Sequence, residues 1–217
     1  MTNKKTNFYK HHKNKPYRYI GIARHSETLE ELVLYETLYE NDLGKLWVRP
    51  KEMFFEKVDV NGKQIERFRP IEFKIEIYKK LTEDKKSLIM ELAKNTLGYF
   101  DLKKFESKLE NHKNFLFLFA YDEKKPVGFK IGYAQDDSVF YSWMGGVEEK
   151  YRVLGIASKL MGLQHDYCKE KGFKLIETRT LNKFSGMLSL NLKNGFEIVG
   201  TFLDYKNQVK IIMQKKL

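Results

Sequence analysis

The chain has 217 residues with 42% hydrophobic content, and its 40 Lys and Arg against 29 Asp and Glu give a formal net charge of +11. This composition is globular rather than disordered, and the length allows one large domain or two small ones. A single cysteine, Cys168, excludes an intrachain disulfide framework, and no run of 18 apolar residues predicts a membrane span, so we expect a cytoplasmic protein.

The first fifteen residues form a basic tail with five lysines and no acidic residue. Such an excess of charge can attract nucleic acid or another polyanion through counterion release. Through most of the chain, however, lysines alternate with acidic residues, which is typical of solvated faces. We therefore favour solvated surface charge over a nucleic-acid interface. The tail leads into no apolar segment, so we expect no secretory signal.

Short alternating segments at 17–25, 31–40 and 45–58 follow, rich in Tyr, Val, Ile and Trp and separated by turn-forming residues. This pattern predicts strands, and Asn61-Gly62 predicts a hairpin turn. Because residues at both odd and even positions of these segments are apolar, we expect a small all-β, barrel-like domain. The pattern changes near Arg69-Pro70, which divides the chain into predicted domains at 1–70 and 71–217.

The second domain alternates strands and helices. Predicted strands cover 71–79, 115–122, 126–135, 138–147, 173–181, 196–206 and 208–216. Predicted helices cover about 82–97, 102–112, 155–172 and 184–194. Strand–helix–strand order at this spacing predicts a partly parallel sheet covered by helices, an α/β arrangement.

The turn before the third of these helices is the strongest candidate site. A strand ends at Val147, and a polar loop leads to Gly155, where the helix begins. Helix N-termini present free N–H groups and a partial positive charge, which suits a phosphate. Glycine lets a ligand approach the backbone closely, and Lys150, Arg152 and Lys159 add positive charge. A purely structural turn is the alternative.

The sequence Arg152-x-x-Gly155-x-Ala157, placed between a strand and a helix, resembles motif A of the GNAT N-acetyltransferases. The resemblance covers 71–217 and implies the GNAT fold, a mixed twisted sheet whose central parallel strands splay apart. It implies acetyl-CoA as cosubstrate, with its pyrophosphate on the turn amides and its pantetheine arm along the preceding strand. Gly145-Gly146 would permit the bulge that opens the splay. The implied cofactor-binding residues are Gly145, Val147, Arg152, Val153, Leu154, Gly155, Ile156, Ala157 and Ser158, with Val153 standing where the family commonly has glycine.

The segment Glu177-x-Arg179-x-x-Asn182 resembles the Glu-x-Arg-x-x-Asn pattern of ribosomal-protein alanine acetyltransferases. A Glu in a central strand is costly unless it is paired or solvated. Glu177 is therefore a candidate general base for an ammonium substrate or, alternatively, the partner of Arg179 in an ion pair. The resemblance places Asn182 on the pantetheine, and capping of the next helix is its alternative role.

The family often carries a tyrosine, four residues before a Gly-Phe pair, that protonates the departing thiolate. Here Asn191 occupies that position, and it could hydrogen-bond the thioester or pantetheine but cannot act as an acid. Tyr141 and Tyr151 are the candidate replacements, and a groove-lining role is the alternative for Tyr141. Cys168 is interpreted as buried filler rather than a nucleophile. No spacing of His or Cys predicts a metal site.

Residues 8–70 resemble a small bacterial family of domains of unknown function. The matching residues include Gly21-Ile22-Ala23-Arg24-His25-Ser26-Glu27-Thr28 and Leu46-Trp47-Val48-Arg49-Pro50. The aromatic and basic residues of this segment could line a binding surface or fill the core of the barrel: Arg24, His25, Tyr35, Tyr39, Trp47 and Arg49.

The sequence thus predicts acetyl transfer from acetyl-CoA to a primary amine by direct attack in a ternary complex. The acceptor would be a small molecule, a protein N-terminus or a lysine, and a homodimer is possible. The alternative is a non-catalytic protein that senses acyl-CoA and is directed to nucleic acid or to a protein partner.

Overall fold

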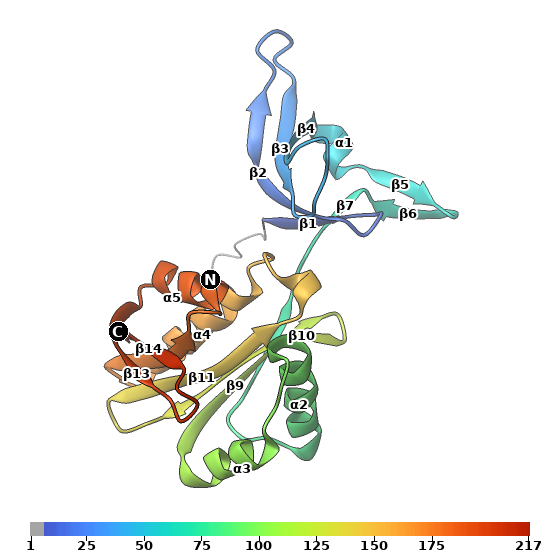
Figure 1. The fold of residues 1–217 in the computed structure, drawn as a ribbon. Helices are drawn as coiled ribbons and strands as arrows, with labels where there is room; N and C mark the ends of the chain where they lie inside the picture. The colour runs from blue at the N-terminus through green and yellow to red at the C-terminus, as the bar shows by residue number, and fades with distance from the viewer. Residues whose placement is uncertain (1–6) are drawn as a thin grey trace. The chain divides into compact units, whose positions relative to one another are not determined.

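The computed structural model describes residues 7–217, so the first six residues of the predicted basic tail lie outside the description. The chain forms two compact units, Met1–Glu72 and Phe73–Leu217 (Figure 1). No helix in the described part of the chain is long and apolar enough to cross a membrane.

The first unit is an open sheet with a separate hairpin. Five of its strands form a sheet in the order β4-β3-β2-β1-β7, and β5 and β6 form a two-stranded sheet of their own. The prediction of a barrel is therefore wrong, because β4 and β7 remain edges and do not pair with each other. The strands are β1 (Phe8–His11), β2 (Pro16–Arg24), β3 (Glu31–Thr37), β4 (Leu46–Pro50), β5 (Lys57–Val60), β6 (Lys63–Glu66) and β7 (Phe68–Pro70).

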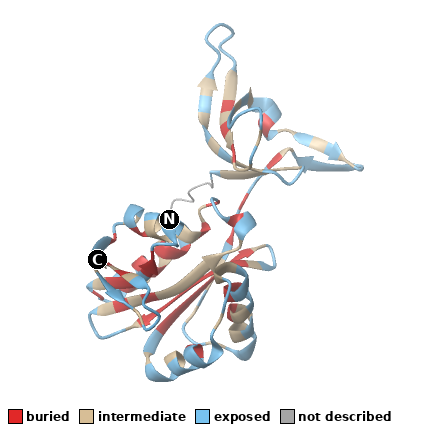
Figure 2. Ribbon diagram, viewed as in Figure 1, coloured by how far each residue is buried: buried red, intermediate tan, exposed pale blue. Residues whose placement is uncertain are grey.

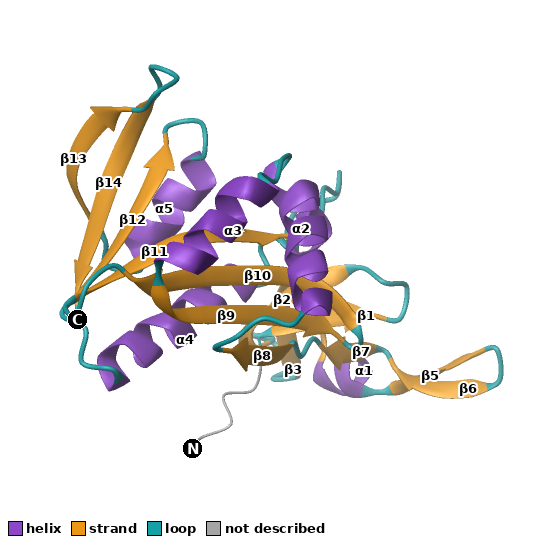
Figure 3. Cartoon of the chain, turned by 90° about the horizontal axis from the view of Figure 1, so that it is seen from below, coloured by secondary structure: helices purple, strands orange, loops and turns teal. Residues whose placement is uncertain are grey.

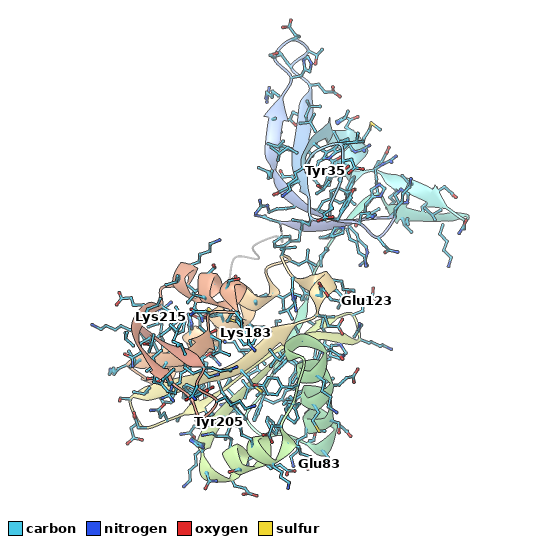
Figure 4. The ribbon with its side chains drawn as sticks, viewed as in Figure 1. Tyr35, Glu83, Glu123, Lys183, Tyr205 and Lys215 are labelled. Atoms are coloured by element: carbon cyan, nitrogen blue, oxygen red, sulfur yellow. The ribbon has the colours of Figure 1, made fainter. Side chains whose placement is uncertain are left out.

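The predicted strand segment 45–58 is interrupted by a short helix, α1 (Lys51–Phe55). Pro50 directly precedes it, and Lys, Glu and Met in its sequence favour helix. The helix buries Phe54, which stacks on Phe68 with ring centroids 4.1 Å apart. With Val33 and Tyr35, these rings form the small core of the unit, and Tyr35 is labelled in Figure 4.

The second unit is a seven-stranded sheet in the order β13-β14-β12-β11-β10-β9-β8, in which only β11 and β12 are parallel. Its strands are β8 (Lys74–Tyr78), β9 (Lys113–Asp122), β10 (Lys125–Ala134), β11 (Val139–Val147), β12 (Leu175–Leu181), β13 (Glu197–Leu203) and β14 (Val209–Lys216). Its helices are α2 (Glu83–Leu97), α3 (Leu102–Asn111), α4 (Ile156–Glu170), α5 (Ser185–Lys193) and the 3-10 turn η1 (Glu149–Tyr151).

The helices cover both faces of this sheet (Figure 3). Phe129, Ile131 and Tyr133 alternate along β10 and pack with residues of α2 and α3 in the main core. Gly132, on the opposite face, lies against Gln164 of α4. Because both faces are covered, β9 and β10 are buried along most of their length (Figure 2).

The two parallel strands separate soon after they meet. They pair from Val139 with Leu175 to Tyr141 with Glu177, and beyond that point Thr178 Oγ1 donates to the Ser142 carbonyl at 2.9 Å. The splay predicted from the resemblance is thus present at the centre of the sheet.

The bulge lies earlier than predicted. Gly132 pairs with Ser142 and Ile131 with Met144, so Trp143 is the extra residue of β11. Gly145 and Gly146 stay in register with β10, so the prediction of a bulge there is wrong. Gly146 has a packing role instead, because a Cβ there would lie 2.1 Å from the Thr96 hydroxyl of α2.

Candidate active site

The turn between β11 and α4 presents unbonded backbone amides. β11 ends at Val147, η1 follows, and Gly155 precedes α4 with a φ of 75°. The first helical bond runs from the Lys159 N–H to the Gly155 carbonyl at 3.0 Å. Within residues 7–217, the amides from Val153 to Ser158 find no acceptor. A helix N-terminus with free donors is a ready site for an anion.

The turn is held in place before any ligand binds. The Tyr151 hydroxyl donates to Asp122 Oδ2 at 2.9 Å, and the Glu148 N–H donates to the Val127 carbonyl at 2.9 Å. Leu154 is buried, and Arg152 Nε donates to the Val147 carbonyl at 3.3 Å. These contacts fix the direction of the amides, so binding an anion requires little ordering of the backbone.

The splay provides a free strand edge beside this turn. β12 is paired with β14 along its whole length from Leu175 to Leu181, whereas β11 leaves β12 after Tyr141. Gly145 and Val147 therefore lie on the part of β11 whose β12-side edge is open. An extended ligand arm could hydrogen-bond that edge as an added strand would.

Asn182 lies in the turn that follows β12 and is exposed. The N-cap position of α5 is Phe184, which makes no side-chain capping bond. Asn182 therefore does not take the capping role considered as its alternative. Its placement on the pantetheine stays a prediction.

A pocket of ≈ 360 Å³ opens on the α3 side of the sheet, where β11 and β12 part. We call it the basic pocket. α3 and the residue after it contribute three basic side chains, and the central strands contribute mainly aromatic rings and one arginine. Its lining residues are Lys104, Lys108, His112, Tyr133, Gln135, Tyr141, Trp143 and Arg179.

Glu177 is buried beside the basic pocket, and both of its carboxylate oxygens accept hydrogen bonds. Oε1 accepts from Arg179 Nε at 3.0 Å and lies 2.9 Å from Arg179 Nη2, while Oε2 accepts from Gln214 Nε2 at 3.0 Å. The ion pair considered from the sequence is therefore present. Each carboxylate oxygen has a second lone pair, so a role as base remains chemically open and stays a prediction.

Tyr141 lies directly opposite Glu177 in the parallel register and lines the basic pocket. Burial is the main cause that raises the pKa of its phenol, with Glu177 adding to the increase and Arg179 opposing it. The hydroxyl is therefore protonated at neutral pH and able to donate a proton. Arg179 also lies 5.6 Å from the centroid of its ring.

Asn191 is not brought together with these residues. It is 2% exposed, and its Nδ2 contacts Met213 Sδ at 3.7 Å. Met213 pairs with Thr178, one position along β14 from Gln214, so it faces away from Glu177. Cys168 is also buried, as interpreted from the sequence, and burial raises the pKa of its thiol to about 12.

Several residues of the basic pocket were not singled out from the sequence. Lys104, Lys108 and His112 recur every four positions, a spacing that could have indicated one face of a helix. Trp143 and Gln135 carried no such local signal, because only the packing of α3 against the sheet brings them to this pocket.

The splayed sheet, the amide-rich turn beyond its open end and the pocket where β11 and β12 part define an acyltransferase-type site. Residues 76–196 match the model of the Acetyltransferase (GNAT) family, and the chain belongs to that family. Residues 7–70 match the model of a protein of unknown function, DUF1653. The comparison with curated proteins gave no match.

Solved structures share this fold at low sequence identity. The IAA acetyltransferase from Bacillus cereus ATCC 14579 matches with a TM-score of 0.57 and 18% identity, covering 67% of this chain and 100% of that one. The ribosomal-protein-S18-alanine N-acetyltransferase from Escherichia coli gives 0.56 and 15%, covering 66% and 94%. A GNAT family acetyltransferase from Elizabethkingia anophelis with acetyl-CoA bound gives 0.52 and 17%, covering 67% and 98%.

Proposed function

We propose that this protein transfers an acetyl group from acetyl-CoA to a primary amine in a ternary complex. The observation that carries the proposal is the set of unbonded amides from Val153 to Ser158, which follow the open end of the splay, while the basic pocket lies where β11 and β12 part. The turn would hold the pyrophosphate, with Arg152 adding charge, and the open edge of β11 would hold the pantetheine. Acetyl-CoA bound there would supply an acyl thioester.

The residues around the splay supply the proton transfers. Glu177 takes a proton from the ammonium group of the acceptor, directly or through one water. The amine nitrogen then attacks the carbonyl carbon of the acetyl group and forms the carbon–nitrogen bond. As the carbon–sulfur bond breaks, the nitrogen gives its second proton to solvent. Tyr141 gives its phenolic proton to the departing sulfur, and solvent restores both groups. Holding the reactants together supplies much of the rate, because the attack becomes effectively unimolecular.

Release of free thiol from acetyl-CoA in a panel of primary amines tests this proposal. We expect Glu177→Gln to lower kcat/KM by about 100-fold or more, because positioned acid–base groups contribute on that order. Tyr141→Phe should lower kcat and leave KM within about threefold, because the lost proton acts only as the thiolate leaves. Glu170→Gln, an exposed change at the end of α4, is the matched control and should leave the rate unchanged.

Two outcomes would contradict the proposed roles. Full activity in Glu177→Gln would remove Glu177 as the base and leave only its ion pair with Arg179. Binding of acetyl-CoA without thiol release from any amine would favour the non-catalytic, acyl-CoA-sensing alternative. The burial of Asn191, at the position where the family often has a tyrosine acid, is the observation that favours that alternative.

A further inference from the structure

The basic pocket carries a strong positive charge. Of its eight lining residues in the described chain, three are Lys or Arg, one is His, and none is Asp or Glu. The carboxylate of Glu177, beside the pocket, already has both oxygens engaged by Arg179 and Gln214. An acceptor with several positive charges would therefore meet like charges here without a free carboxylate to balance them.

The two lysines are not neutralised by the protein. Within residues 7–217 neither Lys104 nor Lys108 forms an ion pair, and Lys108 Nζ instead lies 5.7 Å from the centroid of the Tyr133 ring. His112 packs against the same ring with centroids 4.2 Å apart. Its Nδ1 is buried and has no hydrogen-bond partner among the described residues. An unsatisfied buried polar atom beside two free cations points to a ligand that accepts hydrogen bonds.

The basic residues of the pocket form a stripe along α3. Lys104 and Lys108 are four positions apart on α3, and His112 follows after four more. Like charges four residues apart repel on a helix, so this stripe is unfavourable in the absence of an anion. An anion between them would relieve that repulsion and form charge-assisted hydrogen bonds.

The other wall of the pocket is aromatic. Trp143 stacks on Phe105 with centroids 5.5 Å apart and an interplanar angle of 17°, and Tyr133 lies 5.8 Å from Trp143. Tyr141 lies 5.5 Å from Tyr133 and continues the surface toward the splay. These rings offer an apolar aromatic surface to the part of the acceptor that joins its amine to its charged group.

We infer that the acceptor is an amine that also carries an anionic group, a carboxylate or a phosphate. The inference rests on the proposed function. The anionic group binds Lys104, Lys108 and His112, the body of the acceptor lies on the aromatic wall, and the amine reaches the splay near Tyr141. Simple cationic amines and polyamines are poor acceptors, because they bring no group that the lysines can bind.

Matched acceptors test this inference in the thiol-release assay. Tyrosine and tyramine differ only by a carboxylate, and O-phosphoethanolamine and ethanolamine differ only by a phosphate, so the two pairs distinguish the two anions. We expect the kcat/KM of at least one anionic amine to exceed that of the matched amine without the anionic group by about tenfold or more. Spermidine should be the poorest acceptor.

Charge reversal on α3 shows whether the preference comes from this pocket. Lys104→Glu with Lys108→Glu should abolish or invert the preference, mainly by raising KM for the anionic acceptor. Lys103→Glu changes the neighbouring residue, which does not line the pocket, and should keep the preference. Lys104→Arg keeps the positive charge and should also keep the preference for the anionic acceptor.

A binding measurement decides the inference without turnover. Trp47 and Trp143 are the two tryptophans of the chain, so Trp47→Phe leaves Trp143 as the reporter inside the pocket. Fluorescence titration should give a Kd at least tenfold lower for O-phosphoethanolamine or γ-aminobutyrate than for ethanolamine or butylamine.

The outcomes separate this inference from the proposed function. If no amine releases thiol, the proposed function fails, and the Trp143 titration still decides the anion preference. Two results with thiol release would overturn the inference and leave the proposed function standing. One is an equal kcat/KM for each anionic acceptor and its matched amine. The other is an unchanged preference after the double charge reversal.

Discussion

Val153 has a backbone conformation that its side chain disfavours. Its φ is 63°, in the left-handed region, and the side chain is 68% exposed. A β-branched residue pays about 1–2 kcal/mol there, because Cβ crowds the following carbonyl. Local strain of this kind is found where function fixes the backbone.

Replacing Val153 with glycine should therefore relieve strain. We expect Val153→Gly to stabilise the fold by up to about 1 kcal/mol, since the relief exceeds the roughly 0.5–1 kcal/mol entropic cost of glycine. Val153→Ala keeps a Cβ at the same φ and should gain less. Urea unfolding measures both changes. A loss of 1 kcal/mol or more in the glycine variant would contradict the assignment of strain.

Gly146 is required by the packing of α2 on β11. A Cβ there would lie 2.1 Å from Thr96 Oγ1 and 2.6 Å from Thr96 Cβ. Gly146→Ala should destabilise the protein by about 1–3 kcal/mol, because the helix must shift away from the strand. Gly162→Ala, in α4 with open space around the site, should instead stabilise by up to about 1 kcal/mol. Equal stabilities in thermal unfolding would contradict this packing.

For single residues, the sequence predicts the contacts that form between residues close together along the chain. The Glu177–Arg179 pair follows from two residues on one face of a strand, and the turn follows from a strand, a glycine and a helix in order. The contact of Asn191 with Met213 joins residues 22 positions apart, and no local pattern encodes it. For that reason its side-chain surroundings could not be read from the sequence.

Among the elements, α4 buries polar groups against the sheet. His165 is 6% exposed, and its Nδ1 lies 3.2 Å from Nζ of Lys215, which is labelled on β14 in Figure 4. Burial, together with the smaller effects of the Lys215, Lys130 and Lys169 charges, lowers the pKa of His165 to about 4. The imidazole is therefore neutral in the folded protein at neutral pH.

This histidine should make the fold sensitive to mild acid. Below pH 6.5 the unfolded chain binds a proton that folded His165 does not, so stability falls as pH falls from 6.5 toward 4. The loss is on the order of 2 kcal/mol by pH 5. His165→Asn should flatten that part of the urea-unfolding profile. Parallel profiles for wild type and His165→Asn would contradict the lowered pKa.

The order of elements in the second unit is predictable because each strand and helix has its own periodicity. Two features of the sheets are not. Closure of a barrel would need β4 to pair with β7, and local alternation says nothing about such a long-range pair. The bulge at Trp143 likewise depends on register with β10, so two glycines in sequence did not locate it.

For the whole molecule, the two units have separate cores, and every residue of the proposed site lies in the second. A protein of residues 73–217 should therefore fold and bind acetyl-CoA with a Kd within about threefold of the full chain. Calorimetry on both proteins checks this. A loss of binding in a folded 73–217 protein would show that the first unit contributes to the site.

Isothermal titration of the full chain with acetyl-CoA tests the central claim most directly. We expect saturable 1:1 binding with a Kd between about 1 µM and 1 mM, the range in which enzymes hold such substrates. Arg152→Ala should weaken binding about fivefold or more, and Lys171→Ala, at the far end of α4, should not change it. Absence of binding at millimolar acetyl-CoA, with the protein folded, would contradict the assignment of the turn after β11 as the pyrophosphate site.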